Sequence, residues 1–312
     1  MLHVTNGDAA AEKIRATGVG GEVLPWRDVL HEGPVPAGLP LDELSVVRAD
    51  FIASGEGVEE MRRGFRERDE ALAGFAAHEE VVLWFEHDLY DQLQLAQLLD
   101  FFSTAERGET RLTLVCGPEY LGPSTPERLA ERFAEREEVT AEQLALGHAA
   151  WSAFRSPDPR VVASRVLLDM PELPFLRTAL IRHLEQFPST RNGLSRSEQQ
   201  ALEEIDRGAA TVRDAYLASH HRREDPIWLG DSTFADYMEA LAAGPDPLVA
   251  LGDGGDPMER TLALTDAGRA VLTGQEDRVR LIGLDRWLGG VHLQGHEAHW
   301  RWDVAARRLA EV

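Results

Sequence analysis

The run VVLWF at residues 81–85 constrains the fold of this chain more than any other stretch. A strand with one wet face alternates apolar and polar residues, whereas an unbroken apolar run is typical of a strand covered on both faces. Residues 91–105 follow with helical periodicity, and their inner side is expected to carry Leu93, Leu95, Leu98, Leu99 and Phe102. A buried strand followed at once by an amphipathic helix is the repeating unit of a parallel sheet with helical crossovers.

The same alternation covers the rest of the first third of the chain. Further strands are expected at residues 2–6, 22–26 and 111–116. Helices are expected at residues 8–17, with Asp8 as N-cap, and at residues 41–54 and 58–77. Residues 1–123 are therefore predicted to form a Rossmann-like α/β domain with a mostly parallel sheet.

Two further parts are expected after this domain. Residues 124–193 form a predicted helical middle segment, helical throughout from residue 124 to residue 188. Residues 194–312 are predicted to form a winged-helix-like domain with a terminal β-hairpin at residues 285–303. Its expected helices are 195–205, with Ser195 and Glu198 as a capping box, 211–221 and 231–243, and its wing strands are 247–251 and 261–264.

Composition limits the classes of function. The formal net charge of −22 repels phosphate backbones and anionic lipids, so nucleic acid and membrane partners are not expected. The single cysteine, Cys116, excludes an internal disulfide and a multi-cysteine zinc site. No apolar run approaches the roughly 18 residues of a membrane span, and the first residues lack signal-peptide features. We therefore expect a cytoplasmic, acidic protein.

The first candidate site is NGD, formed by Asn6, Gly7 and Asp8 at the end of the first strand. A helix that starts here points backbone N–H groups at the loop and can hold an anion. The alternative is that Gly7 only makes the turn and Asp8 only caps the helix.

The second candidate is the loop PWRDVLHEGPVP at residues 25–36, which carries Arg27, His31 and Glu32. His31 and Glu32 can act as a base with its orienting carboxylate, or as two metal ligands. The alternative is a rigid Pro/Gly loop with solvated charges.

The third candidate comprises His87, Asp88 and Tyr90, at the point where the strand ends and the helix begins. Asp88 and Asp91 could instead simply open the helix, where acids suit its dipole. In open α/β sheets, ligands bind outside the carboxyl ends of the strands. If the first and third strands are neighbours, all three loops converge on one edge.

These loops together predict one site. Its expected catalytic residues are His31, His87 and Asp88, and its expected ligand-binding residues are Asn6, Gly7, Asp8, Arg27, Glu32 and Tyr90. The chemistry fits a small anionic ligand, phosphate-like or nucleotide-like. The cofactor is undefined, although a divalent metal suits these side chains.

Charge outside the first domain favours structural roles. Residues 151–200 are the only net-positive segment, with 7 arginines against 5 acids, and these arginines are interpreted as ion-pair partners. The expected reading helix of the wing domain carries Asp231, Asp236 and Glu239 and no basic residue. A major-groove helix needs basic or amide side chains. This domain is therefore expected to pack, to form a homodimer or to cover a site.

Three motifs, LHVTNGD, LPWRDVLHEGPVP and LWFEHDLYDQLQL, occur in this order. They resemble a bacterial family of uncharacterised proteins, domain-of-unknown-function family 1835, over roughly residues 1–150. GLSRSEQQALEEI, LTDAGRAVL and DRWLGGVHL resemble the C-terminal portion that accompanies this domain in some members. The resemblance implies no activity and no site residue, since none is established for the family.

Two other classes of function compete with the ligand site. One is a regulatory or protein-interaction protein, in which the wing domain is the working end and the α/β domain senses a ligand. The other is a scaffold whose charges are all solvated. The sequence leaves the three open.

Overall fold

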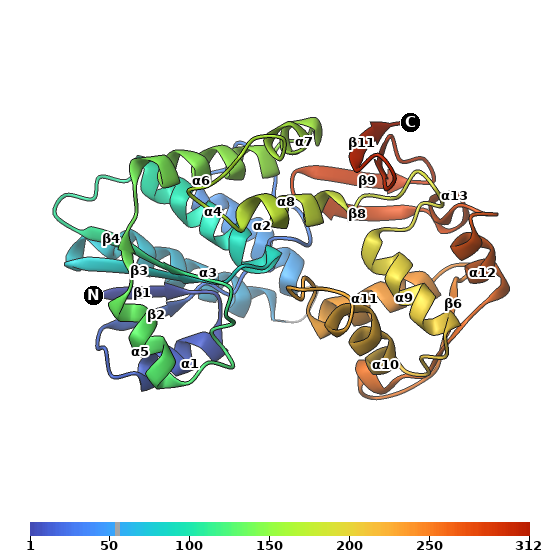
Figure 1. Cartoon of the computed structure of the whole chain (residues 1–312), viewed down its shortest axis with the longest axis horizontal. Helices are drawn as coiled ribbons and strands as arrows, with labels where there is room; N and C mark the ends of the chain where they lie inside the picture. Colours follow the sequence, from blue (N-terminus) through green and yellow to red (C-terminus); the bar gives the residue numbers. More distant parts are fainter. Residues whose placement is uncertain (54–56) are drawn as a thin grey trace. The chain divides into compact units, whose positions relative to one another are not determined.

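The computed structural model describes residues 1–53 and 57–312 (Figure 1). The chain divides into two compact units, residues 1–180 with 289–291 and residues 181–288 with 292–312. Most of the segment 124–193 lies in the first unit. The helix expected at residues 41–54 covers Leu41–Ala53, and residue 54 lies outside the described residues.

The first unit is built on a five-stranded sheet in the order β2-β1-β3-β4-β5. Its strands are β1 Leu2–Thr5, β2 Glu22–Pro25, β3 Glu80–Phe85, β4 Arg111–Cys116 and β5 Glu137–Glu138. The first four run parallel, and β5 pairs antiparallel with β4. The prediction of a mostly parallel α/β sheet is confirmed, as is the adjacency of β1 and β3.

Strand order reverses beside β1, because the chain passes from β1 to β2 on one side and then to β3 on the other. Val4 lies opposite Leu24 on one flank and opposite Leu83 on the other. Every residue of β3 is buried, as its apolar run predicts. The carboxyl ends of β1 and β3 therefore form the switch point at which open parallel sheets bind ligands.

Helices cover both faces of this sheet (Figure 1). The helices of this part of the chain are α1 Asp8–Ala16, α2 Leu41–Ala53, α3 Val58–Ala73, α4 Leu89–Thr104, α5 Pro126–Ala134, α6 Ala141–Phe154, α7 Arg160–Arg165 and α8 Leu176–Leu184. On one face, Ile14 of α1 and Leu129 of α5 pack with Trp84 of β3. Figure 1 shows α4 on the opposite face.

Helix α4 is buried on nearly all sides. The five apolar residues expected on its inner side are all buried. Three glutamines of the same helix, Gln92, Gln94 and Gln97, are buried as well. Each accepts or donates a hydrogen bond, and Gln97 accepts one from the Trp26 indole at 2.8 Å. The helix is thus a central element that carries polar contacts to the neighbouring loops.

The second unit combines short helices with small antiparallel hairpins. Its helices are α9 Arg196–Asp206, α10 Val212–Tyr216, α11 Asp231–Ala242, α12 Asp266–Thr273 and α13 Arg278–Ile282. Its strands are β6 Val249–Leu251, β7 Leu262–Leu264, β8 Leu284–Leu288, β10 Trp300–Asp303 and β11 Arg308–Glu311, and β8 pairs with β9 Val291–Gly295. The predicted capping box of Ser195 and Glu198 opens α9.

Three expectations are wrong in detail. Residues 124–188 are not helical throughout, because β5 pairs with β4 within them. The helix expected at residues 211–221 continues only to Tyr216 and becomes a π-helical turn at Leu217–His221. The terminal segment forms two hairpins, β8–β9 and β10–β11, because the chain turns again before Trp300.

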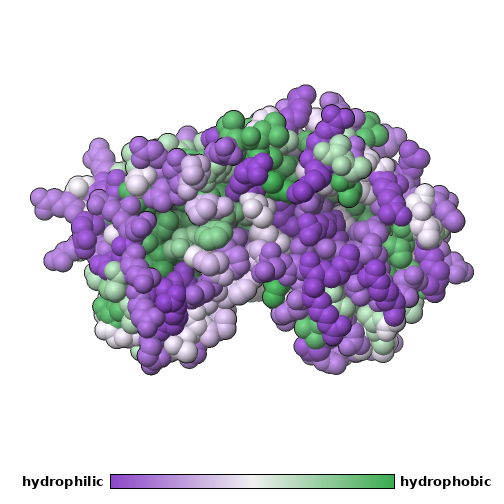
Figure 2. Space-filling view, viewed as in Figure 1, coloured by the Kyte–Doolittle hydropathy of each residue, from purple (hydrophilic) through white to green (hydrophobic). Residues whose placement is uncertain are grey.

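Polar residues cover most of the molecular face seen in Figure 2. Among the helices of residues 1–53 and 57–312, none is both long enough and apolar enough to cross a bilayer.

Candidate functional site

Asn6 joins the carboxyl ends of β1 and β3. Its Nδ2 donates to both carboxylate oxygens of Asp91, at 3.1 and 3.0 Å. The backbone N–H of Glu86 donates to the same carboxylate at 2.7 Å, and the Tyr90 hydroxyl donates to the Asn6 carbonyl at 3.2 Å. The switch point of the sheet is therefore closed by side chains.

Three buried acids gather at this point. Glu86, Asp88 and Asp91 each offer one carboxylate oxygen, and these atoms lie within 4.8 Å of one another. We call these three residues the acid cluster. Only 5%, 9% and 1% of their respective surfaces are exposed. The cluster is thus withdrawn from water as well as compact.

Local sequence explains the arrangement. Glu86 directly follows β3, where the chain leaves the sheet. Asp88 is the N-cap of α4, and its carboxylate accepts the N–H of Asp91 at 2.9 Å. Asp91 lies in the first helical turn and faces back toward Asn6. Strand end, cap and first turn therefore bring three acids together within six residues of chain.

Burial raises the pKa of every acid in the cluster. It raises the pKa of Asp88 to about 7, and the charge of Glu86 adds to the effect. Burial and the charges of Asp88 and Glu86 raise the pKa of Asp91 well above its ordinary value. Burial also raises the pKa of Glu86, although the Leu121 N–H, 2.5 Å from Oε1, favours its charged form. At neutral pH the cluster therefore retains protons unless a cation replaces them.

Within the described residues, no arginine or lysine lies at ion-pair distance from the acid cluster, although the charge of Arg132 acts on Glu86 from farther away. Carboxylate oxygens are ligands that Mg²⁺, Mn²⁺ and Ca²⁺ prefer. One Ca²⁺ at about 2.3–2.6 Å from each oxygen can bridge a span of the size found here. The donor set therefore fits a hard divalent cation.

Asp8 and Arg27 form a different kind of pair. They bond at 2.5 Å with 69% and 58% of their side chains exposed. The prediction that Asp8 caps α1 is wrong by one position, because Gly7 is the N-cap and Asp8 is the first helical residue. The Asp8 carboxylate therefore pairs with the Arg27 guanidinium and does not cap the helix.

The loop that carries His31 is held from below by Arg48, which is fully buried. Its guanidinium donates to the carbonyls of Val29 and Glu32, at 2.8 and 2.7 Å, and to the Asp28 carboxylate at 2.9 Å. His31 is 6% exposed, and its ring meets the edge of Tyr90, with centroids 6.1 Å apart. Tyr90 thereby links the second predicted loop to Asn6.

His87 is half-buried and packs in another direction. Its ring centroid lies 5.1 Å from that of Tyr120 and 5.9 Å from that of Phe175. Of the predicted residues, Asn6, Tyr90 and Asp88 thus join the acid cluster and its hydrogen bonds. His31 contacts Tyr90, which hydrogen-bonds to Asn6, and His87 lies between Glu86 and Asp88 in the sequence.

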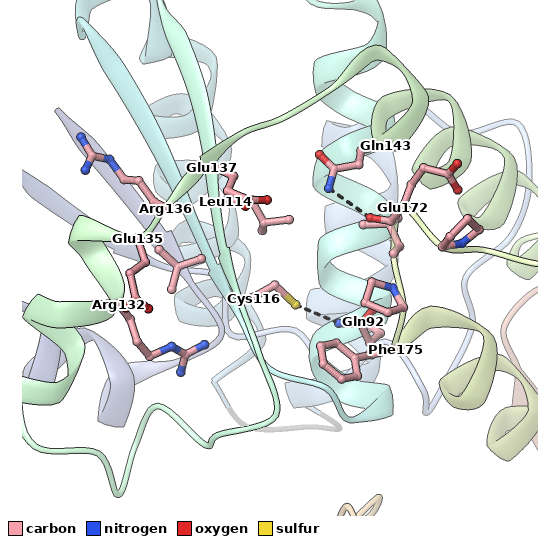
Figure 3. Close-up of a pocket in the computed structure, with 14 residues that line it drawn as sticks. Gln92, Leu114, Cys116, Arg132, Glu135, Arg136, Glu137, Gln143, Glu172 and Phe175 are labelled. Carbon is pink, nitrogen blue, oxygen red and sulfur yellow. Dashed lines mark hydrogen bonds between the residues drawn. The ribbon is translucent and has the colours of Figure 1, made fainter.

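The sequence interpretation leaves Glu86, Asp91 and Arg132 outside the predicted site. Acids near a helix start are usually solvated, so their type gives no sign of burial. A cavity of about 490 Å³ also lies at the carboxyl end of β4, beside Cys116 and Gln92 (Figure 3). Gln92 connects it to the acid cluster, since its amide donates to the Glu86 carbonyl at 2.6 Å.

No protein-family model matches this sequence, and no curated protein matches it either. The resemblance to domain-of-unknown-function family 1835 stays a prediction.

Proposed function

We propose that the first unit, as a Rossmann-like domain, binds or processes a small anionic ligand, phosphate-like or nucleotide-like, at the carboxyl edge of its sheet. The observation that carries the proposal is the acid cluster: three buried carboxyl groups that form no ion pair with an arginine or lysine of the described residues. Groups of this kind are costly for stability, and such groups are common at functional sites.

The position of the cluster supports the proposal. It lies where the strand order reverses between β1 and β3. Ligands of open α/β sheets bind in the crevice at this point. The cavity beside Gln92 offers space next to the same edge.

The cluster has two chemical uses. As a set of hard oxygen ligands, it would hold a divalent cation, which would polarise phosphate or carboxylate oxygens of the ligand. Without a cation, Asp88 is poised to donate a proton, because burial raises its pKa to about 7. Asn6 orients Asp91, and His31 and His87 are proposed as neighbouring proton carriers.

Calorimetric titration with Mn²⁺ and Ca²⁺ at neutral pH tests the proposal. We expect one site in the wild-type protein, with binding weakened about tenfold or more by Asp91→Asn. Binding should also release protons, because the raised pKa values leave the acids protonated beforehand. Repeating the titration in buffers of different ionisation enthalpy measures this release.

Asp8→Asn is the matched control, since it removes an acid from the same end of the sheet but from an exposed pair. It should leave cation binding unchanged. A wild-type protein that binds neither cation, or an Asp91→Asn variant that binds as wild type, would rule out the metal form of the proposal.

A second candidate function belongs to the second unit, which we propose to be winged-helix-like. Three helices, α9, α10 and α11, precede the β6–β7 hairpin, and a β-bridge joins Thr211 to Thr261. The acids of α11 favour a protein partner over nucleic acid, and Glu239 already pairs with Arg260. In this function the unit would report ligand binding to another protein.

An electrophoretic binding assay over a salt series separates the two forms of this candidate. We expect no complex with duplex DNA even at low salt. A complex whose affinity falls steeply with salt would instead support a nucleic-acid partner.

A further inference from the structure

The cavity at the end of β4 is lined by charged and polar side chains on some sides and by apolar side chains on another. Figure 3 shows Arg132, on α5, and Gln92, on α4, on two sides of Cys116. The third wall is the segment that contains Pro174 and Phe175. Burial raises the pKa of Cys116 to about 12, so its thiol is protonated at neutral pH. The cavity is thus a binding space without an activated nucleophile at this position.

Arg132 is the unusual side chain of this cavity. It is only 7% exposed. Its Nη1 donates a long hydrogen bond of 3.3 Å to the Glu119 carbonyl, and its Nη2 has no hydrogen-bond partner. No ion pair in the described part of the chain includes it. A buried guanidinium with an unused donor requires an explanation.

The neighbouring arginines of the same segment are paired. Arg128, one turn earlier on α5, bonds to Glu119 at 2.9 Å and to Glu131 at 3.0 Å. Arg136, just after the helix, bonds to Glu80 at 2.8 Å. Acceptors are therefore plentiful in this segment, yet Nη2 of Arg132 uses none.

Burial lowers the pKa of Arg132 although the charges of Glu119 and Glu86 act in the opposite direction, and an arginine stays charged at neutral pH. The chain leaves this charge next to an open cavity. An anionic group of a ligand would pair with this charge, because a planar guanidinium binds phosphate and carboxylate well.

The remaining walls restrict the ligand further. Pro174 and Phe175 offer an apolar and aromatic surface, and Gln92 and Gln143 offer amides. Glu135, Glu137 and Glu172 also line the cavity, together with Arg136, which already pairs with Glu80. The glutamate charges therefore repel a second anionic group. A volume of about 490 Å³ accommodates a molecule of intermediate size.

We propose that this cavity binds an aromatic or heterocyclic molecule with one phosphate or carboxylate group. Arg132 binds the anionic group, and Phe175 and Pro174 contact the ring. The inference rests on the proposed function for the assumption that the ligand occupies this sheet edge, and it names the class of that ligand. It excludes polyphosphates, because the three glutamates of the cavity oppose added negative charge.

Calorimetric titration with phenyl phosphate and with benzoate, both without metal, tests the inference on the full chain. Wild-type protein should bind at least one of the two. Arg132→Gln should weaken that binding about 10- to 100-fold, because a charge-assisted bond is lost. Arg128→Gln is the matched control on the same helix and should bind as wild type.

Gly117→Ala provides a second variant that keeps the arginine. A Cβ at Gly117 would lie 3.0 Å from Nη2 of Arg132, so it displaces the guanidinium without removing the charge. It should also weaken binding. This variant guards against a folding defect in Arg132→Gln.

Four results would overturn the inference. They are no binding of either compound by wild-type protein, unchanged binding by both Arg132→Gln and Gly117→Ala, an equal loss in Arg128→Gln, or Arg132-dependent binding of tripolyphosphate that is tighter than that of phenyl phosphate. Because no metal is present, failure of the cation titration and failure of this one are distinguishable.

Discussion

Two groups of buried carboxylates in the first unit, at Asp28 and in the acid cluster, differ in their surroundings. Asp28 is fully buried, and Arg48, also fully buried, bonds to it at 2.9 Å. Arg68 approaches the other oxygen of Asp28 at 4.0 Å. The acid cluster of Glu86, Asp88 and Asp91 is similarly buried, yet no arginine or lysine of the described chain forms an ion pair with it.

The difference lies in how the buried charges are balanced. Around Asp28, positive and negative charges balance, and Arg48 uses its other donors to hold the His31 loop. Asp69 pairs with Arg68 at 2.8 Å, so two acids balance two arginines within the chain, although Oδ2 of Asp28 accepts no hydrogen bond. At the switch point no arginine or lysine pairs with the three acids at ion-pair distance in the described chain, and Nη2 of the nearby Arg132 has no hydrogen-bond partner. Unbalanced buried charge at a sheet edge is what a binding site for an ionic ligand requires before the ligand arrives.

The largest effect is expected from breaking the balanced set. Asp28→Asn leaves Arg48 buried without its carboxylate, because the amide carries no charge, whereas Arg68 keeps its bond to Asp69 at 2.8 Å. We expect a loss of about 3–5 kcal/mol in the free energy of unfolding, as for other broken buried pairs. Urea denaturation of the wild type and the variant measures it. A loss below about 1 kcal/mol would show that the Asp28 set resembles a surface pair.

A smaller effect, with a distinctive pH dependence, is expected from Asp88→Asn. Asn is also a good N-cap, so α4 keeps its start. Burial raises the pKa of Asp88 from 3.8 to about 7, so the folded wild type binds this proton more tightly than the unfolded chain. Wild-type stability therefore falls as pH rises through this window, and the variant lacks that loss.

Between about pH 4 and about pH 8, the variant should gain roughly 2–4 kcal/mol relative to wild type, since a change of one unit in pKa corresponds to about 1.4 kcal/mol. Urea denaturation at several pH values, without divalent cations, gives the difference. A stability difference that is constant with pH would contradict the proton-retaining acid cluster. Added Mn²⁺ should stabilise wild type more than the variant at the upper pH values.

The smallest effect is expected from Asp8→Asn, which breaks the exposed pair with Arg27. We expect a change below about 1 kcal/mol that shrinks further in high salt, since exposed pairs are screened. Its pH dependence should have the opposite sign to that of Asp88→Asn. The hydrogen bond from Arg27 lowers the pKa of Asp8, so the pair's contribution is lost as pH falls. Denaturation curves at two salt concentrations and two pH values measure both trends.

Local patterns predict the framework of the molecule well. The apolar run of β3, the inner side of α4 and the capping box of α9 were all readable, because each depends on neighbours in sequence. Strand β5 could not be predicted from the sequence. It has two exposed glutamates and forms only because β4 supplies its partner.

The sequence predicted where the candidate site lies, but it predicted only some of the residues that form it. Adjacent β1 and β3 bring Asn6 to Asp91, as the loop pattern implies. Burial of Glu86, Asp91 and Arg132 depends on how whole helices pack, and no local pattern in a polar residue reports that. Asp8 is the opposite case. It lies at the predicted edge of the sheet, but its carboxylate is exposed and pairs with Arg27.

Strand β5 also affects how this protein behaves among copies of itself. The free edge of a sheet can recruit a strand from another chain, which is a route to aggregation. On the β4 side, that edge is covered by only two residues, Glu137 and Glu138, and both are exposed. The two negative charges repel an incoming acidic strand of the same protein. Two residues, too few for a recognisable strand pattern in the sequence, thus protect this edge from pairing with other copies.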